Sequence, residues 1–275
     1  MAKIRLAALD VDGTLVRSDL SLSPAVIRAV ESLRDAGIVV SINTGRSMGE
    51  MIDFLRSLPW IRYFVVSNGA TGYDAEMGKT FYENHLPITI AREIEREAQK
   101  YPVLTQVYAD GTSYLDEALW PHITRFTAEH MHHPSLIAGY TPVEHVGDLL
   151  AARENDIEKL YISFEDLSDL PRLCAYCERF PVDLVTSIHN GLEITQKGVE
   201  KGTGLVALCE YLGILPEETA VIGDGLADIA MFRHASLSIA MENALPAVKE
   251  AATLIAPSNN DDGAIWSIEQ ILSAK

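Results

Sequence analysis

The sequence predicts an α/β protein whose core is a Rossmann-like parallel sheet with helices on both faces, interrupted by an inserted α+β domain. Two observations carry this prediction. Short apolar strands alternate with helices in the first and last thirds of the 275 residues, and repeated strand–helix–strand units imply a parallel sheet with right-handed crossovers. The middle third has a different pattern. We therefore expect a core made of 1–83 and 190–275, with an inserted domain at 84–189.

The first third contains three strands and two helices of the predicted core. The first helix has the clearest signals, because Ser23 is a favourable N-cap, Pro24 occupies the first helical position and Gly37 follows the end. The strands are short runs rich in apolar residues. In chain order, the expected elements are strand 5–10, helix 23–37, strand 38–45, helix 47–58 and strand 63–69.

The last third resumes the same alternation after the run Leu192–Thr195, which we expect to bring the chain back into the core. Within the inserted domain, Asp110 and Gly111 separate two strand-like runs and predict a β-hairpin over 103–115. Isolated strands are expected at 158–164 and 182–188. The core elements that follow are helix 201–213, strand 219–225, helix 226–235, strand 237–241, helix 244–252, strand 253–257 and a closing helix from about Asp262.

Charge and composition restrict the partners of this protein. The formal net charge of −17 argues against sequence-independent binding to nucleic acid and against binding to anionic membranes, since both need a basic surface. No apolar run reaches the length of a membrane span. Three cysteines fit a reducing cytoplasm, and the spacing of Cys174 and Cys177 fits one packed helix face better than a redox or zinc site. We expect a cytoplasmic monomer or homodimer with a small-molecule partner.

Polar residues follow the predicted core strands at the points where those strands end. The carboxyl ends of parallel strands share one edge of a sheet, and ligands bind at that edge in open α/β folds. Two acids, one residue apart, end the first strand, and two more follow the strand that begins at Thr219. The residues that we expect at this edge are Asp10, Asp12, Thr44, Gly45, Arg46, Asn68, Lys201, Asp224 and Asp228.

This set of residues is suited to phosphoryl transfer with a divalent metal. Asp10, Asp12 and Asp224 offer hard oxygen ligands for Mg²⁺, which prefers one or two carboxylates together with water and a phosphate. One carboxylate can attack phosphorus and form an aspartyl-phosphate, and a second can protonate the leaving oxygen and then activate water. Lys201 would neutralise charge on the nucleophile and the phosphate. The Thr44 hydroxyl and nearby helix-start amides would hold phosphoryl oxygens.

Four segments in this order, DVDGTL, TGR, KGTGL and GDGLAD, resemble the motifs of the haloacid dehalogenase (HAD) superfamily. The run IAMENALPAVKEAATLIAPSNNDDGA and the earlier SNGA are similar to its Cof-like phosphatases, in which the inserted domain is an α/β cap that selects the substrate. The resemblance implies that Asp10 is the nucleophile and that Asp12 is the general acid/base, with its backbone carbonyl as a metal ligand. It implies that Thr44 supplies the phosphate-binding hydroxyl and that Lys201 is the motif-three lysine. Asp224 would be the acidic metal ligand, and Asp228 would bind the metal through water or orient Lys201.

Two positions depart from the family pattern, and several residues keep two interpretations. Ala227 stands where Asn is usual and removes an amide that could steady the metal or Lys201, while Glu242, where Gly is usual, adds negative charge near the phosphate site. For Arg46 we favour contact with the substrate over a surface ion pair. Asn68 could serve either a turn or the substrate, and Asn243 could serve either as a helix cap or at the ligand site.

These features predict a Mg²⁺-dependent phosphatase that hydrolyses a small phosphomonoester through an aspartyl-phosphate. A sugar phosphate is the first choice of substrate and a phosphorylated cofactor the second. Asp12 favours a phosphatase or a phosphomutase, because an alcohol leaving group needs a proton. The alternatives are a phosphomutase and a catalytically weak sugar-phosphate sensor, which Ala227 would permit. His130, His132 and His133 have no supporting ligand set, so we favour a solvated helix end there over a transition-metal site.

Overall fold

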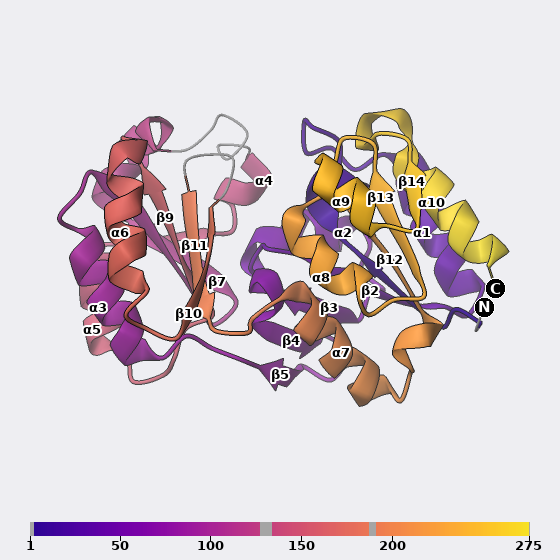
Figure 1. Cartoon of the computed structure of the whole chain (residues 1–275), viewed down its shortest axis with the longest axis horizontal. Coiled ribbons are helices and arrows are strands. Elements are labelled where there is room, and N and C mark those ends of the chain that lie inside the picture. Colours follow the sequence, from indigo (N-terminus) through magenta and orange to yellow (C-terminus); the bar gives the residue numbers. More distant parts are fainter. Residues whose placement is uncertain (1–2, 127–133, 187–190, 275) are drawn as a thin grey trace. The chain divides into compact units, whose positions relative to one another are not determined.

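The computed structural model describes residues 3–126, 134–186 and 191–274 (Figure 1). The chain divides into two compact units. The first comprises Met1–Gly45, Phe54–Glu83 and Glu200–Lys275, and the second comprises Arg46–Asp53 and Asn84–Val199. Each unit has a sheet and an apolar core of its own. The histidines at positions 130, 132 and 133 lie outside the described residues.

The first unit is built on an eight-stranded sheet with the order β14-β13-β12-β1-β2-β3-β4-β5. The strands from β14 to β3 are parallel, as predicted, and β4 and β5 add an antiparallel hairpin at one edge. β1 is central, because Leu6 pairs with Val39 on one side and with Thr219 on the other. The strands are β1 (Leu6–Leu9), β2 (Val39–Asn43), β3 (Tyr63–Val66), β4 (Thr71–Asp74), β5 (Lys79–Glu83), β12 (Thr219–Gly223), β13 (Leu237–Met241) and β14 (Leu254–Ala256).

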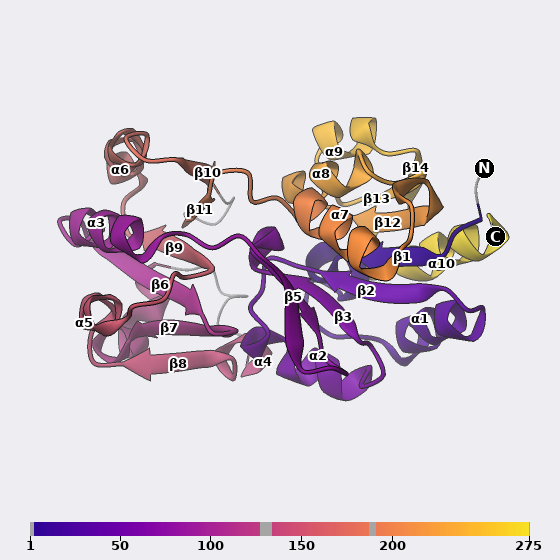
Figure 2. The same cartoon turned by 90° about the horizontal axis from the view of Figure 1, so that it is seen from below.

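Helices cover both faces of this sheet (Figures 1 and 2). α7, α8 and α9 pack on one face through an apolar cluster that includes Ala8, Leu205 and Met231, whereas α1 and α10 lie together on the other face. β1 is buried on both faces, which explains why its sequence is an unbroken apolar run. The helices are α1 (Pro24–Asp35), α2 (Ile52–Ser57), α7 (Lys201–Leu212), α8 (Ile229–Phe232), α9 (Pro246–Ala251) and α10 (Gly263–Ser273).

The second unit has a six-stranded sheet with the order β10-β11-β9-β6-β7-β8. Its strands pair antiparallel except for β7 and β8, and α3, α5 and α6 cover one face around Val107, Leu160 and Leu192. The predicted hairpin is confirmed, since β6 and β7 turn through Asp110 and Gly111, both with positive φ. The elements are α3 (Ile88–Ala98), β6 (Val103–Ala109), β7 (Thr112–Asp116), α4 (Pro134–Ile137), β8 (Tyr140–Val143), α5 (Val146–Ala152), β9 (Lys159–Phe164), α6 (Leu170–Cys177), β10 (Val182–Thr186) and β11 (Gly191–Gln196).

Two segments lie in a different unit from the one expected from the sequence. Leu192–Thr195 belongs to β11, which pairs with β9 and β10 in the second unit and is not a core strand. Residues 47–53, expected to begin the second core helix, comprise the short turn Gly49–Met51 and the start of α2, and they belong to the second unit. In both cases long-range contacts decide the location, and the local pattern is the same in either unit. The β4–β5 hairpin was not predicted, because such short strands give little periodic signal.

The cysteines have the packing role that their spacing predicted. Cys174 and Cys177 lie on α6 within the apolar cluster of the second unit, and both are free thiols. Within 3–126, 134–186 and 191–274, no helix combines the length and the apolar character that crossing a bilayer requires.

Candidate active site

Asp10 directly follows β1 and precedes the tight loop Val11–Leu15. Its main-chain N–H continues the β1–β12 pairing by donating to the carbonyl of Ile222 at 3.0 Å. The loop turns at Gly13, whose φ is +71°, and a Cβ at this position would lie 2.2 Å from Oδ2 of Asp224. Glycine is therefore needed both for the left-handed conformation and for the close approach. The turn leaves Asp10 buried, with 4% of the residue exposed.

Lys201 is the first residue of α7, and its ammonium group lies between two carboxylates. Nζ donates to Oδ1 of Asp10 at 2.6 Å and to Oδ1 of Asp228 at 2.7 Å. Reciprocal hydrogen bonds between Glu200 and Thr203 hold the start of α7 in place. Burial alone lowers the pKa of Lys201, but Asp10 and Asp228 outweigh burial and raise that pKa above its ordinary value. The two carboxylates therefore favour the cationic form of Lys201.

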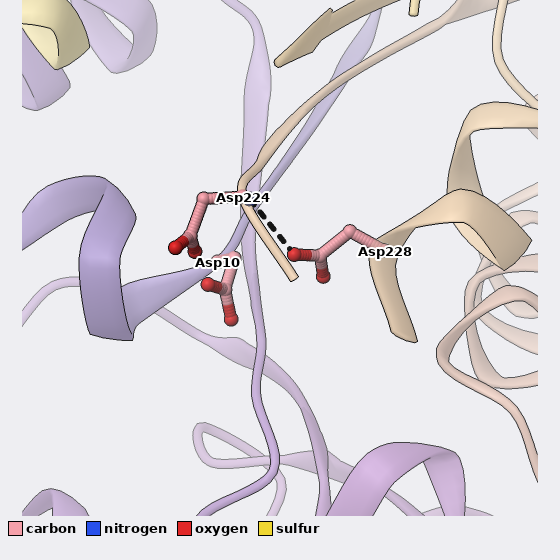
Figure 3. Close-up of side chains that lie close together, drawn as sticks. All are labelled: Asp10, Asp224 and Asp228. Atoms are coloured by element: carbon pink, nitrogen blue, oxygen red, sulfur yellow. Dashed lines mark hydrogen bonds between the residues drawn. The ribbon is translucent and has the colours of Figure 1, made fainter. Parts of the chain in front are cut away.

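Asp228 is fully buried and holds Lys201 in place. While its Oδ1 accepts from Lys201, its Oδ2 accepts from the main-chain N–H groups of Asp224 at 3.0 Å and Gly225 at 2.8 Å. The dashed line in Figure 3 marks the bond to the main chain of Asp224. Of the two roles expected for Asp228, its direct contacts correspond to the orientation of Lys201.

Three carboxylates meet at this edge of the sheet. Asp10, Asp224 and Asp228 each bring an oxygen to within 4.8 Å of the others (Figure 3). Oγ1 of Thr14 lies 3.2 Å from Oδ2 of Asp10 and 3.1 Å from Oδ1 of Asp224. Because a hydroxyl carries one proton, Thr14 can donate to only one of these carboxylates at a time. Thr14 was assigned no role from the sequence, although it lies within DVDGTL.

The crowding of acids changes their titration. Burial, and then the charge of Asp228, raises the pKa of Asp10 well above its usual range, although Lys201 opposes the shift. Burial and Asp228 also raise the pKa of Asp224 to about 6. Three carboxylates around one lysine carry excess negative charge, which a divalent cation would compensate. The donor set therefore fits Mg²⁺, to which Asp10 and Asp224 would offer carboxylate oxygens.

Asp12 differs from the other acids in its surroundings. Its side chain is exposed, and it is not a member of the carboxylate cluster found among the described residues. Its backbone carbonyl remains in the loop that follows Asp10.

Thr44, Gly45 and Asn68 meet where β2 and β3 end. The N–H of Thr44 donates to the carbonyl of Val65 at 2.9 Å, and the carbonyl of Thr44 accepts from the N–H of Asn68 at 3.1 Å. Asn68 has a φ of +59°, so it serves the left-handed turn that was one of its two expected uses. A Cβ on Gly45 would lie 2.7 Å from Oδ1 of Asn68, which places this side chain against the main chain of Gly45.

Asn243 contacts the acidic cluster directly. Its Nδ2 donates to the carbonyl of Gly13 at 2.9 Å and to Oδ2 of Asp224 at 3.1 Å. Its Oδ1 accepts from the N–H of Asn259 at 3.0 Å. It does not cap α9, whose N-cap residue is Leu245. The geometry thus places Asn243 beside the acidic cluster, and Asn259, for which the sequence suggested no role, holds it there.

The two departures from the family pattern are partly compensated by neighbouring charges. Nζ of Lys249 lies 2.5 Å from Oε2 of Glu242, so an ion pair offsets the additional negative charge. Ala227 lies in the turn Leu226–Asp228. Because Lys201 already has two carboxylate partners, it is held without an amide at position 227.

Arg46 directly follows Gly45 in the chain but belongs to the second unit. Its Nη1 donates to the carbonyl of Glu50 at 3.2 Å, and 8% of the residue is exposed.

Comparisons with known proteins identify the family of this chain. A family model described as haloacid dehalogenase-like hydrolase matches residues 7–268. A 5-amino-6-(5-phospho-D-ribitylamino)uracil phosphatase of Bacillus subtilis is 25% identical over 279 residues, covering 98% of this chain and 97% of that protein. A pyridoxal phosphate phosphatase of Escherichia coli is 26% identical over 265 residues, covering 94% of this chain and 95% of that protein. A solved haloacid dehalogenase-like hydrolase from Bacteroides thetaiotaomicron superimposes with a TM-score of 0.85 at 25% identity, covering 98% of this chain and 100% of that one.

Proposed function

Because this chain belongs to the haloacid dehalogenase-like hydrolase family, we propose that it is a Mg²⁺-dependent phosphatase that hydrolyses a small phosphomonoester through an aspartyl-phosphate on Asp10. The observation that carries the proposal is the buried ion pair of Lys201 with Asp10, beside Asp224 and the Thr14 hydroxyl. An ammonium group and a hydroxyl hold the Asp10 carboxylate in one orientation. They also offset part of the repulsion between this carboxylate and an approaching phosphate.

The chemistry needs two displacements at phosphorus. In the first, an oxygen of Asp10 forms a bond to phosphorus while the bond to the leaving alcohol oxygen breaks, and Asp12 donates its proton to that oxygen. In the second, Asp12 takes a proton from water, the water oxygen bonds to phosphorus and the bond to Asp10 breaks. Inorganic phosphate leaves and both carboxyl groups return to their starting states. Lys201 remains cationic throughout and offsets negative charge on Asp10 and the phosphoryl group.

Asp10, Asp224 and the backbone carbonyl of Asp12 would hold the metal ion. Asp228 has both carboxylate oxygens engaged by Lys201 and by main-chain N–H groups, so it would act on the ion through water or through the position of Asp224. Mg²⁺, when bound, supplies positive charge to the phosphoryl oxygens.

The phosphate and substrate contacts come from the ends of neighbouring strands. The Thr44 hydroxyl and the main-chain N–H of Gly45 would hold phosphoryl oxygens, and Asn68 supports the main chain at Gly45. Asn243 would fix Asp224 through its side-chain amide. Arg46 would provide a buried cation for the substrate.

The leaving group is proposed at the level of a chemical class. Two relatives with similar identity to this chain are named for different substrates, one for a ribitylaminouracil phosphate and one for pyridoxal phosphate. Both substrates are phosphomonoesters, so the shared chemistry lies in the phosphoryl group. We propose sugar phosphates as the first class and phosphorylated cofactors as the second, with the cap predicted at 84–189 as the part that selects among them.

Phosphate release from a panel of sugar phosphates and phosphorylated cofactors, measured with Mg²⁺, tests this function. The parent protein should release phosphate and Asp10→Asn should release none, because an amide cannot form the acyl-phosphate. Asp12→Asn should lose most activity on alkyl phosphates and less on an aryl phosphate, whose leaving group needs no proton. Asp35→Asn is a matched control, since Asp35 is an exposed surface residue. Equal turnover by Asp10→Asn and the parent, with deamidation excluded, would refute the role of Asp10. Isomerised product without net phosphate release would identify a phosphomutase.

A further inference from the structure

The segment Arg46–Asp53 belongs to the second unit, yet it directly follows the phosphate-binding residues Thr44 and Gly45 of the first. One peptide bond, between Gly45 and Arg46, joins the two. Consecutive Cα atoms across a trans peptide are held about 3.8 Å apart, so this connection has no slack. Phe54, where the chain re-enters the first unit, is buried. We call residues 46–53 the coupling segment.

The coupling segment is held by hydrogen bonds among its own residues. The N–H of Ser47 donates to Oε2 of Glu50 at 2.7 Å, and the N–H of Glu50 donates to Oγ of Ser47 at 3.3 Å. This reciprocal pair is a capping box, which fixes the first turn of a helix. Arg46 adds a third bond from its guanidinium group to the carbonyl of Glu50. The position of Glu50 therefore determines the positions of Ser47 and Arg46.

Three elements of the second unit hold this turn from outside. The hydroxyl of Tyr108, on β6, donates to Oε1 of Glu50 at 3.1 Å. The N–H of Gly49 donates to the carbonyl of Gly111, in the β6–β7 turn, at 2.7 Å. Gly139 lies so close that a Cβ on it would be 2.5 Å from Cα of Glu50. The segment thus has little room to move relative to the second unit.

Glu50 is an unusual residue for a connecting loop, because only 3% of it is exposed. Burying a carboxylate is costly unless its oxygens are hydrogen-bonded, and here each oxygen has a donor. Burial raises the pKa of Glu50. With both oxygens bonded, the buried carboxylate ties the segment to Tyr108 of the second unit.

We propose that Glu50 is a positioning residue, which holds the coupling segment against Tyr108 and thereby links the state of the second unit to phosphate binding at Thr44 and Gly45. This inference rests on the proposed phosphate site. Loss of the Tyr108–Glu50 bond should let the segment and Gly45 sample positions in which the phosphate-binding N–H groups are misplaced. The apparent affinity for phosphate then falls in proportion to the fraction of molecules that keep the phosphate-binding arrangement.

Tyr108→Phe tests the link, because it removes one hydroxyl and leaves the ring on the sheet. The matched control is Tyr114→Phe, in which the ring packs against the apolar cluster of the second unit. With Mg²⁺ present, Tyr108→Phe should bind inorganic phosphate about 10-fold more weakly by titration calorimetry, since a hydrogen bond to a charged group is lost. Tyr114→Phe should bind as the parent does. In a Thr44→Val background, Tyr108→Phe should have little further effect.

A second measurement needs no ligand. Amide hydrogen exchange in Tyr108→Phe should accelerate at Ser47 and Gly49 and also at Gly45 and Arg46. Faster exchange confined to 47–53 would overturn the proposal. So would a double variant, Tyr108→Phe with Thr44→Val, whose loss of phosphate affinity equals the product of the two single losses. If the parent binds no phosphate, the proposed function fails, and exchange at 45–46 still decides whether the coupling exists. Glu50→Gln, which keeps the shape of the side chain, serves as the second variant should Tyr108→Phe not fold.

Discussion

Asp224→Asn should stabilise the protein when divalent metal is absent and destabilise it, relative to the parent, when Mg²⁺ is bound. Without a metal, the ionised carboxylate of Asp224 faces burial and the charge of Asp228, which raise its pKa from 3.8 to about 6. A carboxyl group whose folded pKa is raised binds protons more tightly in the folded state than in the unfolded state. Its ionisation therefore lowers the free energy of unfolding as pH rises through about 4 to 6.

The size of the effect follows from that shift. A change of about two pH units in pKa is worth about 3 kcal/mol at pH values well above 6. The substitution also has a cost, because Asp224 accepts hydrogen bonds from Thr14 and Asn243 and an asparagine can accept only one of them in the same geometry. One lost hydrogen bond costs about 1 kcal/mol. We therefore expect a net gain of about 2 kcal/mol at pH 8 in chelator, which disappears below about pH 4.

Urea unfolding at pH 8 measures the change in the free energy of unfolding, which should be a gain in chelator and a loss in saturating Mg²⁺. Mg²⁺ stabilises the parent by mass action and stabilises the variant less, because the variant lacks a charged ligand. Asp74→Asn is the matched control from the same unit. A hydrogen bond from Arg62 lowers the pKa of Asp74 to about 2, so its loss should destabilise the protein equally with and without Mg²⁺. A less stable Asp224→Asn protein in chelator at pH 8, or a change independent of Mg²⁺, would refute the reasoning.

Three further predictions concern the same site. Removal of divalent metal should abolish turnover, and Mg²⁺ should restore it. Ca²⁺ should inhibit, because it accepts more ligands at longer distances and lets Asp10 chelate instead of attack. Full activity after verified metal removal would contradict this prediction. Lys201→Met should lower the free energy of unfolding in chelator by about 3–5 kcal/mol, because Asp10 and Asp228 remain buried without their cation. Urea unfolding measures this free energy, and a loss under about 1 kcal/mol would contradict the prediction. Ala227→Asn should raise the affinity for Mg²⁺ by up to about 10-fold and change kcat less, since Lys201 is already held by two carboxylates; kinetics across a Mg²⁺ titration separate these quantities.

Local sequence signals were sufficient for most elements of the first unit. Ser23 caps α1 as predicted, because its hydroxyl accepts from the N–H of Val26 at 3.2 Å, and Gly213 ends α7 with a φ of +63°. The parallel strands were predictable for a related reason, since a strand covered on both faces has to be apolar throughout. The strand ends then indicated which polar residues share one edge of the sheet, and the family resemblance supplied their expected roles.

Only the tertiary structure decided which partners those residues meet. Strand 192–195 has the same pattern whether it pairs in the core or with β9 and β10, and pairing over long sequence separations selects the second unit. Thr14 and Asn243 contact the acidic cluster because the loop after β1 folds tightly around Gly13. The hydrophobic periodicity of the sequence does not predict such a loop conformation. The capping box in residues 47–50 is visible in the sequence, but its attachment to Tyr108 is not. A hydrogen bond depends on where two side chains lie in space, whereas sequence patterns report only how each segment is buried.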